Sequence, residues 1–556
     1  MNIWEVILDM IKSQGVEYIF GLGDTDLQLF AEKTPGIRPI NIRYEGSAPF
    51  MASAYSRLTG KPGVCSASAG PGVANLVPGI LEAYSGCMPL IVISPVTSQE
   101  NEGMGAFQEC DQLGIMKPIT KWSARISSAE RIPWFVYRAF SIAINGQPGP
   151  VFLEFPYDIT GKARTELKEI DKPDYKPAKK IPVEADGQLV SEAVDLILKA
   201  KKPIIIAGNG AVLSGAGEEL KEFIELLGIP FMTTPGGRGI IPESHPLALG
   251  VCGIYRTIVG KEIYSSSDLV ISLCSRNEGF QTHDWKDFPE GARFIQIDIS
   301  PFEIGRNWIP EVGILGDAKS VLGQLTDSIK EKLDIKKDYN EIQRVKEIVR
   351  SKKDFEKEVE RECKTIEKPV PAKRIVHELS EIFGRDTILV NENGSQDTWS
   401  YCFPYYKILE GSKTIPVAEQ TCMGMGVVGA ISAKLTKPGK KVVCVVGDGA
   451  FQMYMKELPT AVQYNIGCTW IVLNNSALGW IKHNQEKSVG YNTSTFKAQP
   501  DFIKWAQACN CHGRKVEEPQ DIKPALEEAL AFNNKGIPVV LDFITGIDMS
   551  HFERAE

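Results

Sequence analysis

Short apolar runs alternate with amphipathic stretches along most of the chain. In the first 165 residues the apolar runs include EYIFGL, GVCSAS and PLIVISP, which have the length and composition of buried strands. The spacing of apolar residues between them predicts helices over residues 47–58 and 73–84. Strands that alternate with helices predict a parallel sheet covered on both faces. An amphipathic first helix is predicted by apolar residues at helical spacing, namely Ile3, Val6, Ile7, Met10 and Ile11.

The same alternation recurs in two further blocks. The second block contains KPIIIAGNG, DLVISLC and RFIQIDIS, and the third contains TILVNENG, KVVCVVGDG, TWIVLNN and PVVLDFI. A Lys- and Pro-rich segment, TELKEIDKPDYKPAKKIPVEADG, predicts a linker after the first block. The charged stretch SKKDFEKEVERECKTIEK predicts a solvated connector helix before the third. The sequence therefore predicts three α/β domains with doubly wound parallel sheets, over residues 1–165, 185–330 and 368–556.

Composition narrows the class of protein. Of the 556 residues, 43% are hydrophobic and 24% charged, which is typical of a soluble globular protein. The net charge of −8, with basic residues spread along the chain, argues against a nucleic-acid partner. No stretch is long and apolar enough to span a membrane, and charges interrupt the apolar run at the N-terminus, unlike in a signal peptide. The twelve scattered cysteines lack metal-site spacing and predict reduced thiols in a cytoplasmic protein.

Two predicted strands of the third block end in polar residues. The run KVVCVV leads into Gly447-Asp448-Gly449, and the next strand ends in Asn474-Asn475. Because parallel strands end at one edge of a sheet, Asp448 and Asn475, 475 − 448 = 27 positions apart, can converge on one ion. Their oxygens are hard ligands suited to magnesium, and the two glycines let backbone amides approach a diphosphate closely.

This block resembles the thiamine diphosphate-binding motif. The resemblance implies that the side chains of Asp448 and Asn475 and the carbonyl group of Ala477 ligate Mg²⁺. It also implies that further residues of the motif contact the cofactor, namely Gly447, Gly449, Ala450 and Leu478.

A glutamate in the first block carries the second part of the resemblance. Glu45, in NIRYEGSAPFMASAYSRLTG, follows a predicted strand and immediately precedes a predicted helix, and GVCSASAGPGVANLVPGILEAYSGCMPLIVIS follows downstream. The whole run resembles the pyrimidine-binding domain of the acetolactate synthase and pyruvate oxidase group, which has a glutamate at the matching position. Glu45 would then hydrogen-bond the far nitrogen of the pyrimidine ring, so that the cofactor's amino group can take the proton from thiazolium C2. Burial raises carboxyl pKa values, which helps such a group to share a proton. An exposed loop carboxylate is the alternative interpretation.

The resemblance covers almost the whole chain. The segment EQTCMGMG resembles the stretch under the cofactor, which implies contacts from Thr421, Met423 and Met425. Met423 would prop the two rings into a bent V, and a core methionine is the alternative. In this family the two domains that hold one cofactor come from different subunits, which implies a homodimer or a homotetramer. A looser match to the position that touches the diphosphate consists of Gly394, Ser395 and Gln396.

The central block carries a weaker nucleotide signal. GNGAVLSG opens a Rossmann-like block but lacks the GxGxxG spacing. Related enzymes bind FAD here, or ADP, or nothing. Arg276 and Asp298 sit where family members contact an adenine nucleotide, and the alternative is a structural arginine and a strand-end aspartate.

The first block also indicates what the substrate pocket contains. No histidine precedes His245, which excludes the paired histidines of simple 2-oxo acid decarboxylases. Acidic residues are available instead, since Asp24 and Asp26 follow a predicted strand where the family's substrate loop lies. Acetolactate synthases usually carry Pro-Gly-Gly there, whereas this chain has Gly23-Asp24-Thr25. Either aspartate could instead cap the following helix.

Two further matches and two mismatches concern the synthase group. GAFQECDQ resembles its Phe-Gln-Glu segment, which implies that Phe107 and Gln108 lie near the cofactor, and Lys121 in ITKWS also matches. The acidic–arginine pair that holds the second 2-oxo acid is replaced near residues 279–280. The tryptophan after the Asn-Asn pair is replaced by Asn484.

The stretch LGWIKHNQE offers other pocket residues. Trp480 and His483 could line the substrate site, and a surface position is the alternative for His483. Together with Glu45, Gln108 and Asp24, His483 completes the predicted catalytic set.

The leading interpretation is a thiamine-diphosphate-dependent carboligase that decarboxylates pyruvate and joins the fragment to a second carbonyl group, as acetolactate synthase does. The second interpretation is a lyase, decarboxylase or hydrolase that acts on a 1,2-dione or on a 2-hydroxyacyl or oxalyl thioester with the same cofactor. The third is a catalytically silent regulatory protein, against which the presence of Glu45, Asp448 and Asn475 argues.

Overall fold

The structure is a computed structural model that describes residues 3–160, 176–333, 338–392 and 394–550. The chain forms two compact units. The N-terminal unit consists of Met1–Ile181, Gln420–Gly439 and Gln452–Ile466, and the C-terminal unit contains the rest of the chain. Two segments of the predicted third domain therefore belong to the unit that contains the first.

The N-terminal unit is built on a parallel sheet of six strands in the order β2-β1-β3-β4-β6-β5. Its order reverses at the β1/β3 pair, where the chain switches from one side of the sheet to the other. The strands are β1 (Tyr18–Gly21), β2 (Arg38–Asn41), β3 (Gly63–Ser66), β4 (Leu90–Val96), β5 (Trp122–Arg125) and β6 (Val151–Pro156).

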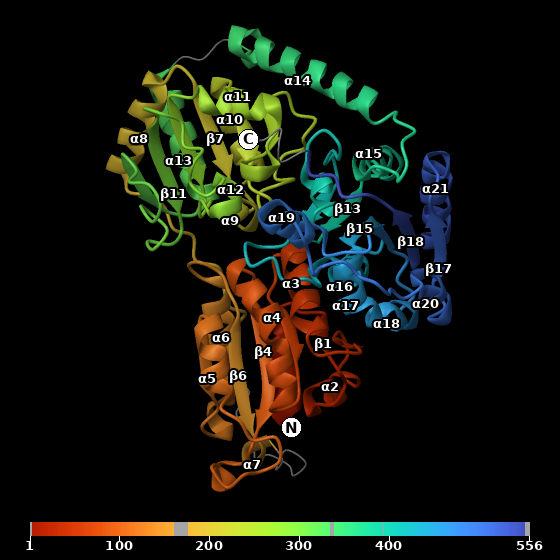
Figure 1. Cartoon of the computed structure of the whole chain (residues 1–556). Coiled ribbons are helices and arrows are strands. Elements are labelled where there is room, and N and C mark those ends of the chain that lie inside the picture. Colours follow the sequence, from red (N-terminus) through yellow and green to blue (C-terminus); the bar gives the residue numbers. More distant parts are fainter. Residues whose placement is uncertain (1–2, 161–175, 334–337, 393, 551–556) are drawn as a thin grey trace. The chain divides into compact units, whose positions relative to one another are not determined.

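Helices pack on both faces of this sheet (Figure 1). The apolar residues of the first helix, Ile3 and Ile7 among them, are buried as its periodicity predicts. The later helix α16 (Met425–Thr436) packs on α3, where Ser432 donates a hydrogen bond to the carbonyl oxygen of Met51. Besides α16, the helices of this unit are α1 (Ile3–Ser13), α2 (Asp26–Ala31), α3 (Ser47–Thr59), α4 (Pro71–Ser85), α5 (Gln112–Met116), α6 (Ile132–Ile144), α7 (Tyr157–Thr160) and α18 (Leu458–Gln463).

The C-terminal unit contains two more six-stranded parallel sheets. The central sheet has the order β12-β11-β10-β7-β8-β9. Its strands are β7 (Pro203–Ala207), β8 (Phe231–Thr233), β9 (Ala248–Val251), β10 (Leu269–Leu273), β11 (Arg293–Asp298) and β12 (Val312–Leu315). Its helices are α8 (Gly187–Lys199), α9 (Asn209–Ser214), α10 (Gly217–Leu227), α11 (Ile258–Ser265), α12 (Gly279–Thr282) and α13 (Ala318–Lys332).

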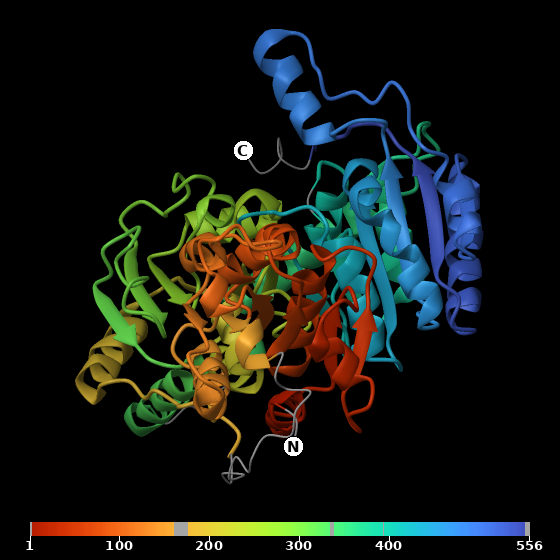
Figure 2. The same ribbon diagram turned by 90° about the horizontal axis from the view of Figure 1, so that it is seen from below.

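The third sheet has the order β14-β13-β15-β16-β18-β17. Its strands are β13 (Thr387–Asn391), β14 (Lys413–Ile415), β15 (Lys441–Gly447), β16 (Thr469–Asn474), β17 (His512–Val516) and β18 (Val539–Ile544). Figure 2 shows α19, in blue, standing away from these strands. The helices beside this sheet are α15 (Ala372–Phe383), α17 (Asp448–Tyr454), α19 (Gly479–Val489), α20 (Phe502–Ala508) and α21 (Ile522–Asn533).

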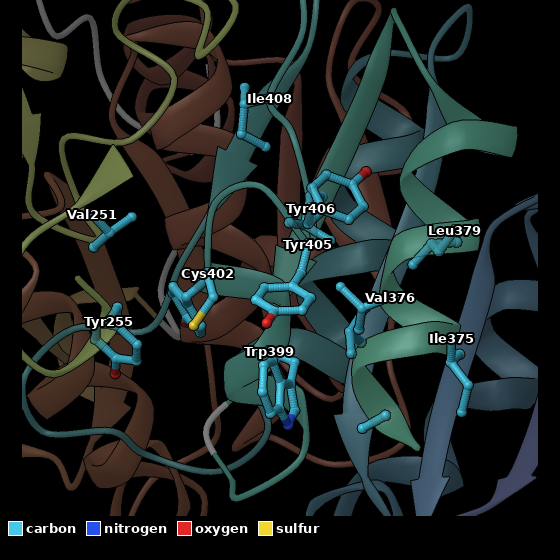
Figure 3. Packing of buried hydrophobic residues seen from close by; sticks show 14 of the residues in the cluster. Val251, Tyr255, Ile375, Val376, Leu379, Trp399, Cys402, Tyr405, Tyr406 and Ile408 are labelled. Atoms are coloured by element: carbon cyan, nitrogen blue, oxygen red, sulfur yellow. The ribbon is translucent and has the colours of Figure 1, made fainter. Parts of the chain in front are cut away.

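The core of the C-terminal unit continues from the central sheet into the third. The ring of Trp399 lies 4.7 Å from that of Tyr405 and packs near Val376 of α15 (Figure 3). Tyr255, from beside the central sheet, stacks on Tyr401 with their ring centroids 4.9 Å apart. This shared aromatic core fixes the loop after β13 against the central sheet.

A buried ion pair beside the central sheet makes hydrogen bonds across the same junction. Nε and Nη2 of Arg238 lie 2.7 and 3.0 Å from the two carboxylate oxygens of Glu243. The guanidinium also donates to the carbonyl oxygens of Ser400 and Tyr406, at 2.6 and 2.8 Å. All three guanidinium nitrogens and both carboxylate oxygens therefore take part in hydrogen bonds, as buried charges require.

Most of the expected elements are present. The predicted α/β class and its three doubly wound parallel sheets are confirmed, whereas the exact domain boundaries stay predictions. The predicted connector helix is α14 (Gln343–Glu362), but it is not solvated all round, because it buries a stripe that includes Ile348, Phe355 and Val359. Part of the predicted linker, 161–175, lies outside the described residues.

Two general expectations concern cysteines and membranes. None of the twelve cysteines forms a disulfide, and eight of them are buried. Among the described helices, none has both the length and the apolar character needed to cross a bilayer.

Candidate active site

Asp448 occupies the point where β15 ends and α17 begins. Its side chain is buried, and its carboxylate accepts a hydrogen bond from Nε2 of Gln499. Backbone N–H groups of Gly449 and Ala477 donate to it as well. Burial raises the pKa of the Asp448 carboxyl to about 6. The raised pKa means that burial disfavours the charged carboxylate, and a bound cation would stabilise that charge.

Asn475 follows β16, the neighbour of β15. Because the two strands are parallel and in register from Val443 with Thr469 onward, Asp448 and Asn475 leave the same edge of the sheet. Oδ1 of Asn475 is buried and has no hydrogen-bond partner among the described residues. A buried amide oxygen without a partner costs free energy unless another group binds it.

The loop after β13 reaches the same place. Ser395 and Gln396 are buried, and a β-carbon built on Gly479 would lie 2.2 Å from Oγ of Ser395 and 2.9 Å from Nδ2 of Asn475. Gly449 is similarly crowded, since its β-carbon would lie 2.6 Å from Cδ2 of Leu478. Cofactor residues predicted from three separate segments thus converge at one edge, namely Gly394–Gln396, Gly447–Ala450 and Asn475–Leu478.

These residues fit a magnesium diphosphate. The set offers one buried carboxylate, one partnerless amide oxygen and backbone groups beside glycines, which are the donors that Mg²⁺ shares with phosphate and water. Within the described part of the chain, no three His, Cys, Asp or Glu side chains form a metal-binding group. The sequence did not single out Gln499, because its contact with Asp448 spans 51 positions.

Glu45 lies in the N-terminal unit, between β2 and α3. It is half-buried, and its Oε2 accepts a hydrogen bond from Nδ2 of Asn75 at 3.2 Å. N–H groups of Ser47 and Ala48 donate to the carbonyl oxygens of Tyr44 and Glu45, each at 2.9 Å, and close a tight turn. Glu45 is therefore not the freely exposed loop carboxylate of the alternative interpretation.

The predicted stretch under the cofactor lies in the same unit. Thr421 adopts a left-handed conformation, Met423 is half-buried, and Met425 is buried at the first position of α16. Gly424 has a φ of 121°, and a β-carbon there would lie 2.3 Å from the ring of Tyr454. Only glycine fits this bend.

Gln108 and its neighbours form a loop that protrudes from the unit. Gln108 has a φ of 59°, and a β-carbon on Gly70 would lie 2.6 Å from the Gln108 carbonyl oxygen, so the loop rests on the Gly-Pro-Gly turn. Phe107 is 87% exposed. Lys121, in contrast, is directed inward: its ammonium donates to the carbonyl oxygens of Ile142 and Asn145, and burial lowers its pKa to about 8.

A cavity of about 440 Å³ opens at the topological switch point of the first sheet. Asp24 and Asp26 line it together with Ser66 and Tyr157. Burial raises the pKa of the Tyr157 hydroxyl, and the nearby charges of Asp26 and Asp24 add to this effect. The idea that either aspartate caps α2 is wrong, because the N-cap is Thr25, whose hydroxyl accepts from the N–H of Gln28 at 3.4 Å. The side chains of both aspartates line the wall of the cavity instead.

Comparison with known proteins decides the family. Three models of the thiamine pyrophosphate enzyme family match the chain: the N-terminal TPP binding domain over residues 1–115, the central domain over 190–325 and the C-terminal TPP binding domain over 393–543. The chain belongs to the thiamine pyrophosphate enzyme family. It is therefore a thiamine-diphosphate-dependent enzyme, as the sequence predicts.

Its similar relatives in this family carry the name acetolactate synthase. A probable acetolactate synthase large subunit of Methanococcus aeolicus is 34% identical over 98% of this chain and 92% of the relative. Acetolactate synthase large subunits of Haemophilus influenzae and of Buchnera aphidicola subsp. Schizaphis graminum are both 32% identical, over 96% and 97% of this chain and 92% and 94% of the relatives. The predicted resemblance to the acetolactate synthase group is confirmed.

Two residues of the expected substrate region, Phe280 and Trp480, meet in the C-terminal unit. The ring of Phe280 on α12 stacks on that of Trp480 on α19, with centroids 6.0 Å apart. His483 is half-buried on α19, and Asn484 is exposed. Trp480 thus packs against Phe280, near which the acidic–arginine pair of the synthase group is replaced.

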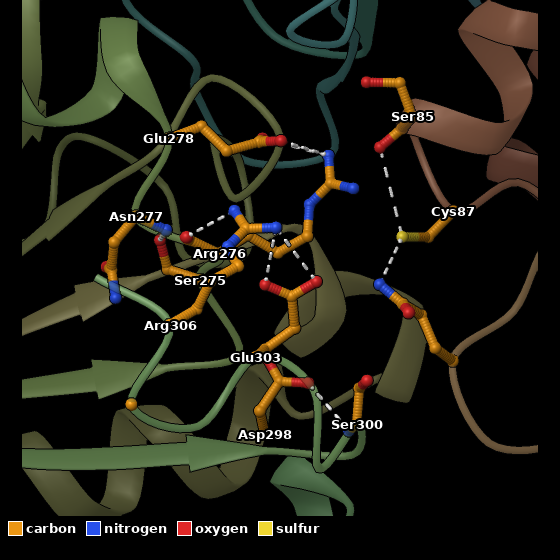
Figure 4. Close-up of polar contacts among 12 residues, drawn as sticks. Ser85, Cys87, Ser275, Arg276, Asn277, Glu278, Asp298, Ser300, Glu303 and Arg306 are labelled. Carbon is orange, nitrogen blue, oxygen red and sulfur yellow. Dashed lines mark hydrogen bonds and ion pairs between the residues drawn. The ribbon is translucent and has the colours of Figure 1, made fainter. Parts of the chain in front are cut away.

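The predicted adenine-nucleotide residues of this family member lie among acidic neighbours (Figure 4). Arg276 pairs with Glu278 at 2.9 Å, and Arg306 bonds the carbonyl oxygen of Arg276 and the carboxylate of Glu303. Oδ1 of Asp298 accepts a hydrogen bond from the N–H of Ser300 at 2.9 Å, and burial raises the pKa of the Asp298 carboxyl to about 7. Arg276 and Asp298 therefore each have hydrogen-bond partners within the C-terminal unit.

Proposed function

We propose that the protein is a Mg²⁺- and thiamine-diphosphate-dependent carboligase that decarboxylates a 2-oxo acid, pyruvate first, and joins the remaining fragment to a second carbonyl compound, as its relatives' name acetolactate synthase indicates. The observation that carries the proposal is the pairing of a buried Asp448 carboxylate with a partnerless Asn475 oxygen at adjacent strand ends.

The metal and the diphosphate take the edge of the third sheet. We assign the side chains of Asp448 and Asn475 and the carbonyl group of Ala477 to Mg²⁺. Gly394, Ser395, Gln396, Gly447, Gly449, Ala450 and Leu478 would bind the diphosphate end, and Thr421, Met423 and Met425 the region between the rings. When bound, thiamine diphosphate supplies a nucleophilic carbon that also accepts the electrons released by decarboxylation.

The chain's own part in catalysis is to hold protons and to orient the reactants. Glu45 would hold a proton against the far pyrimidine nitrogen, which would make the cofactor's amino group basic. Gln108, His483 and Asp24 are assigned to the substrate side. Asp24 and Asp26 place negative charge in the cavity, so we infer that they set how readily an anionic substrate enters it.

The experiment is a product assay. Purified protein with Mg²⁺, thiamine diphosphate and pyruvate is expected to form acetolactate, measured colorimetrically and by carbon dioxide release. Protein that retains no thiamine diphosphate in the presence of Mg²⁺ would contradict the proposal at its foundation. Protein that retains the cofactor but forms no acetolactate would reject the carboligase reaction alone.

The acid-lined cavity favours one second candidate. A lyase, decarboxylase or hydrolase that acts on a 1,2-dione or on a 2-hydroxyacyl or oxalyl thioester would place a neutral group, rather than a second carboxylate, beside Asp24 and Asp26. A screen of such substrates for cofactor-dependent product separates the two functions.

Assembly, location and the central nucleotide complete the proposal. We expect a cytoplasmic homodimer or homotetramer, which light scattering of the purified protein tests. FAD or ADP is the expected ligand class at Arg276 and Asp298, and an absorbance spectrum of the purified protein together with nucleotide analysis after denaturation tests it.

A further inference from the structure

Glu457 is a fully buried acid whose carboxylate has a complete set of donors. It ends the short 3₁₀ helix Met455–Glu457, and Thr460 donates to its Oε2 at 2.6 Å. Oγ of Ser47 donates to Oε1 at 2.8 Å, and the amide nitrogen of Arg43 lies 3.1 Å from both oxygens. A buried carboxylate with all its acceptors occupied is held in one orientation.

The donors of Glu457 bracket Glu45. Arg43 lies two positions before Glu45, and Ser47 lies two positions after it. The turn between them is closed by its own backbone hydrogen bonds. Glu457 therefore fixes both ends of the five-residue segment that carries Glu45, without touching the Glu45 side chain itself.

Lys456 adds a charge at the same place. Its Nζ lies 3.4 Å from the ring centroid of Tyr44, the residue before Glu45. Burial lowers the pKa of Lys456. The negative charges of Glu457 and Glu45 raise it and so partly offset burial, which means that the ammonium lies near both carboxylates. A cation near two acids offsets their mutual repulsion.

We infer that Glu457 is the positioning residue of Glu45: it sets the direction in which the Glu45 carboxyl presents itself to the pyrimidine ring. The inference rests on the proposed role of Glu45. Catalysis is sensitive to such placement, because a displacement of about 1 Å can cost about 10²-fold in rate. Glu457 lies nine positions beyond Asp448, so one short stretch of chain carries a metal ligand and the support of the catalytic acid.

The test compares two ligands on two proteins. Tryptophan fluorescence titration measures the affinity of thiamine diphosphate, with Mg²⁺, for the wild-type protein and for Glu457→Gln. The second ligand is an analogue in which the far pyrimidine nitrogen is replaced by a C–H group, which removes the bond to Glu45. Glu457→Gln is expected to bind thiamine diphosphate about tenfold more weakly, the effect of one hydrogen bond to a charged group, and to bind the analogue as the wild type does.

Kinetics give a second readout. Turnover of Glu457→Gln is expected to fall about tenfold or more with KM for pyruvate unchanged, because the inferred role of Glu457 acts on the cofactor rather than on the substrate. Thr460→Val is the matched control: it removes one donor to Glu457 but no contact with the Glu45 turn, and it should preserve the preference for thiamine diphosphate over the analogue. Ser47→Ala removes a bond to the turn directly and serves if Glu457→Gln does not fold.

Each outcome is decisive. Equal weakening of both ligands, or of neither, by Glu457→Gln and Ser47→Ala would overturn the positioning role. If Glu45→Gln itself leaves thiamine diphosphate affinity and turnover unchanged, the proposed function of Glu45 fails instead, and the two failures are thereby distinguished.

Discussion

Ser395 and Asn475 approach each other over the α-carbon of Gly479. A β-carbon at this position would lie 2.2 Å from Oγ of Ser395 and 2.9 Å from Nδ2 of Asn475, so no side chain fits between them. Gly479 is also the first residue of α19. The glycine therefore keeps a proposed diphosphate contact and a proposed metal ligand within reach of one ligand.

Gly479→Ala should separate these two groups. Overpacking of a tight site costs about 1–3 kcal/mol, so we expect the affinity for Mg²⁺ and thiamine diphosphate to fall about 10- to 100-fold, as measured by isothermal titration calorimetry. Gly323→Ala, on α13 where a β-carbon meets nothing within 4 Å, is the control and should bind normally. Normal binding by Gly479→Ala would show that Ser395 and Asn475 do not share a ligand.

Glu45→Gln should stop turnover without loss of the metal. We expect carbon dioxide release from pyruvate to fall by about 10²-fold or more, because the amide cannot share a proton with the pyrimidine ring. Asp448→Asn should instead lose Mg²⁺ binding, which calorimetry detects. A Glu45→Gln protein that keeps its turnover would remove this residue from catalysis.

Arg238→Met should weaken the junction between the central and third sheets. The change leaves buried Glu243 without its partner, and breaking a buried pair costs about 3–5 kcal/mol in the free energy of unfolding. Urea denaturation measures this, and Arg238→Met/Glu243→Gln should recover part of the loss. Lys330→Met, in an exposed ion pair, should change little. An equal effect of the buried and exposed changes would contradict this account.

Asp298→Asn should stabilise the protein at high pH. Burial raises the pKa of this carboxyl from 3.8 to about 7, so the folded state binds the proton more tightly than the unfolded state. The free energy of unfolding that it contributes is therefore highest below the unfolded value and falls as pH rises through about 7. We expect Asp298→Asn to gain about 1–3 kcal/mol above pH 7 and almost nothing near pH 4, in urea denaturation at both pH values.

The control for this pH dependence is Asp327→Asn, an exposed position on α13. It should show no such gain at high pH. A pH-independent effect of Asp298→Asn would mean that the carboxyl is not strained by burial.

Asp24→Asn should make the cavity more accessible to an anionic substrate. Removing one negative charge from its wall is expected to lower KM for pyruvate about two- to fivefold at low salt, an effect that about 0.5 M salt should abolish by screening. Initial-rate measurements at both salt concentrations test this, with Glu32→Gln as an exposed control. An unchanged KM would place the cavity outside the substrate path.

The elements and the metal motif were predictable because their signals are local. The alternation of apolar runs predicts β1, β3 and β4. The spacing from Asp448 to Asn475 matches the length of one strand-helix-strand unit. Helix α3 begins at Ser47, as its apolar pattern indicates, and this places Glu45 directly before it.

Contacts between distant segments left no such signal. Glu457 meets Ser47 across 410 positions, and Tyr157 meets Asp24 only because β6 and β1 end at the same edge. The sequence also could not predict that α16 packs on α3. Both helices are buried on nearly every face, so no single apolar stripe marks the side that meets the other helix. The sequence therefore predicts candidate site residues such as Glu45, but not the distant residues that hold them in place.

The burial of most cysteines has a practical consequence. Burial raises the pKa of the thiols of Cys65, Cys252 and Cys402, so these groups resist alkylation and oxidation at neutral pH. Cys422 is only partly covered and stands between Thr421 and Met423. A maleimide reagent added to the intact protein would thus reach Cys422 more readily than the buried thiols, and protection of Cys422 by thiamine diphosphate would report occupancy of the proposed coenzyme site without any engineered label.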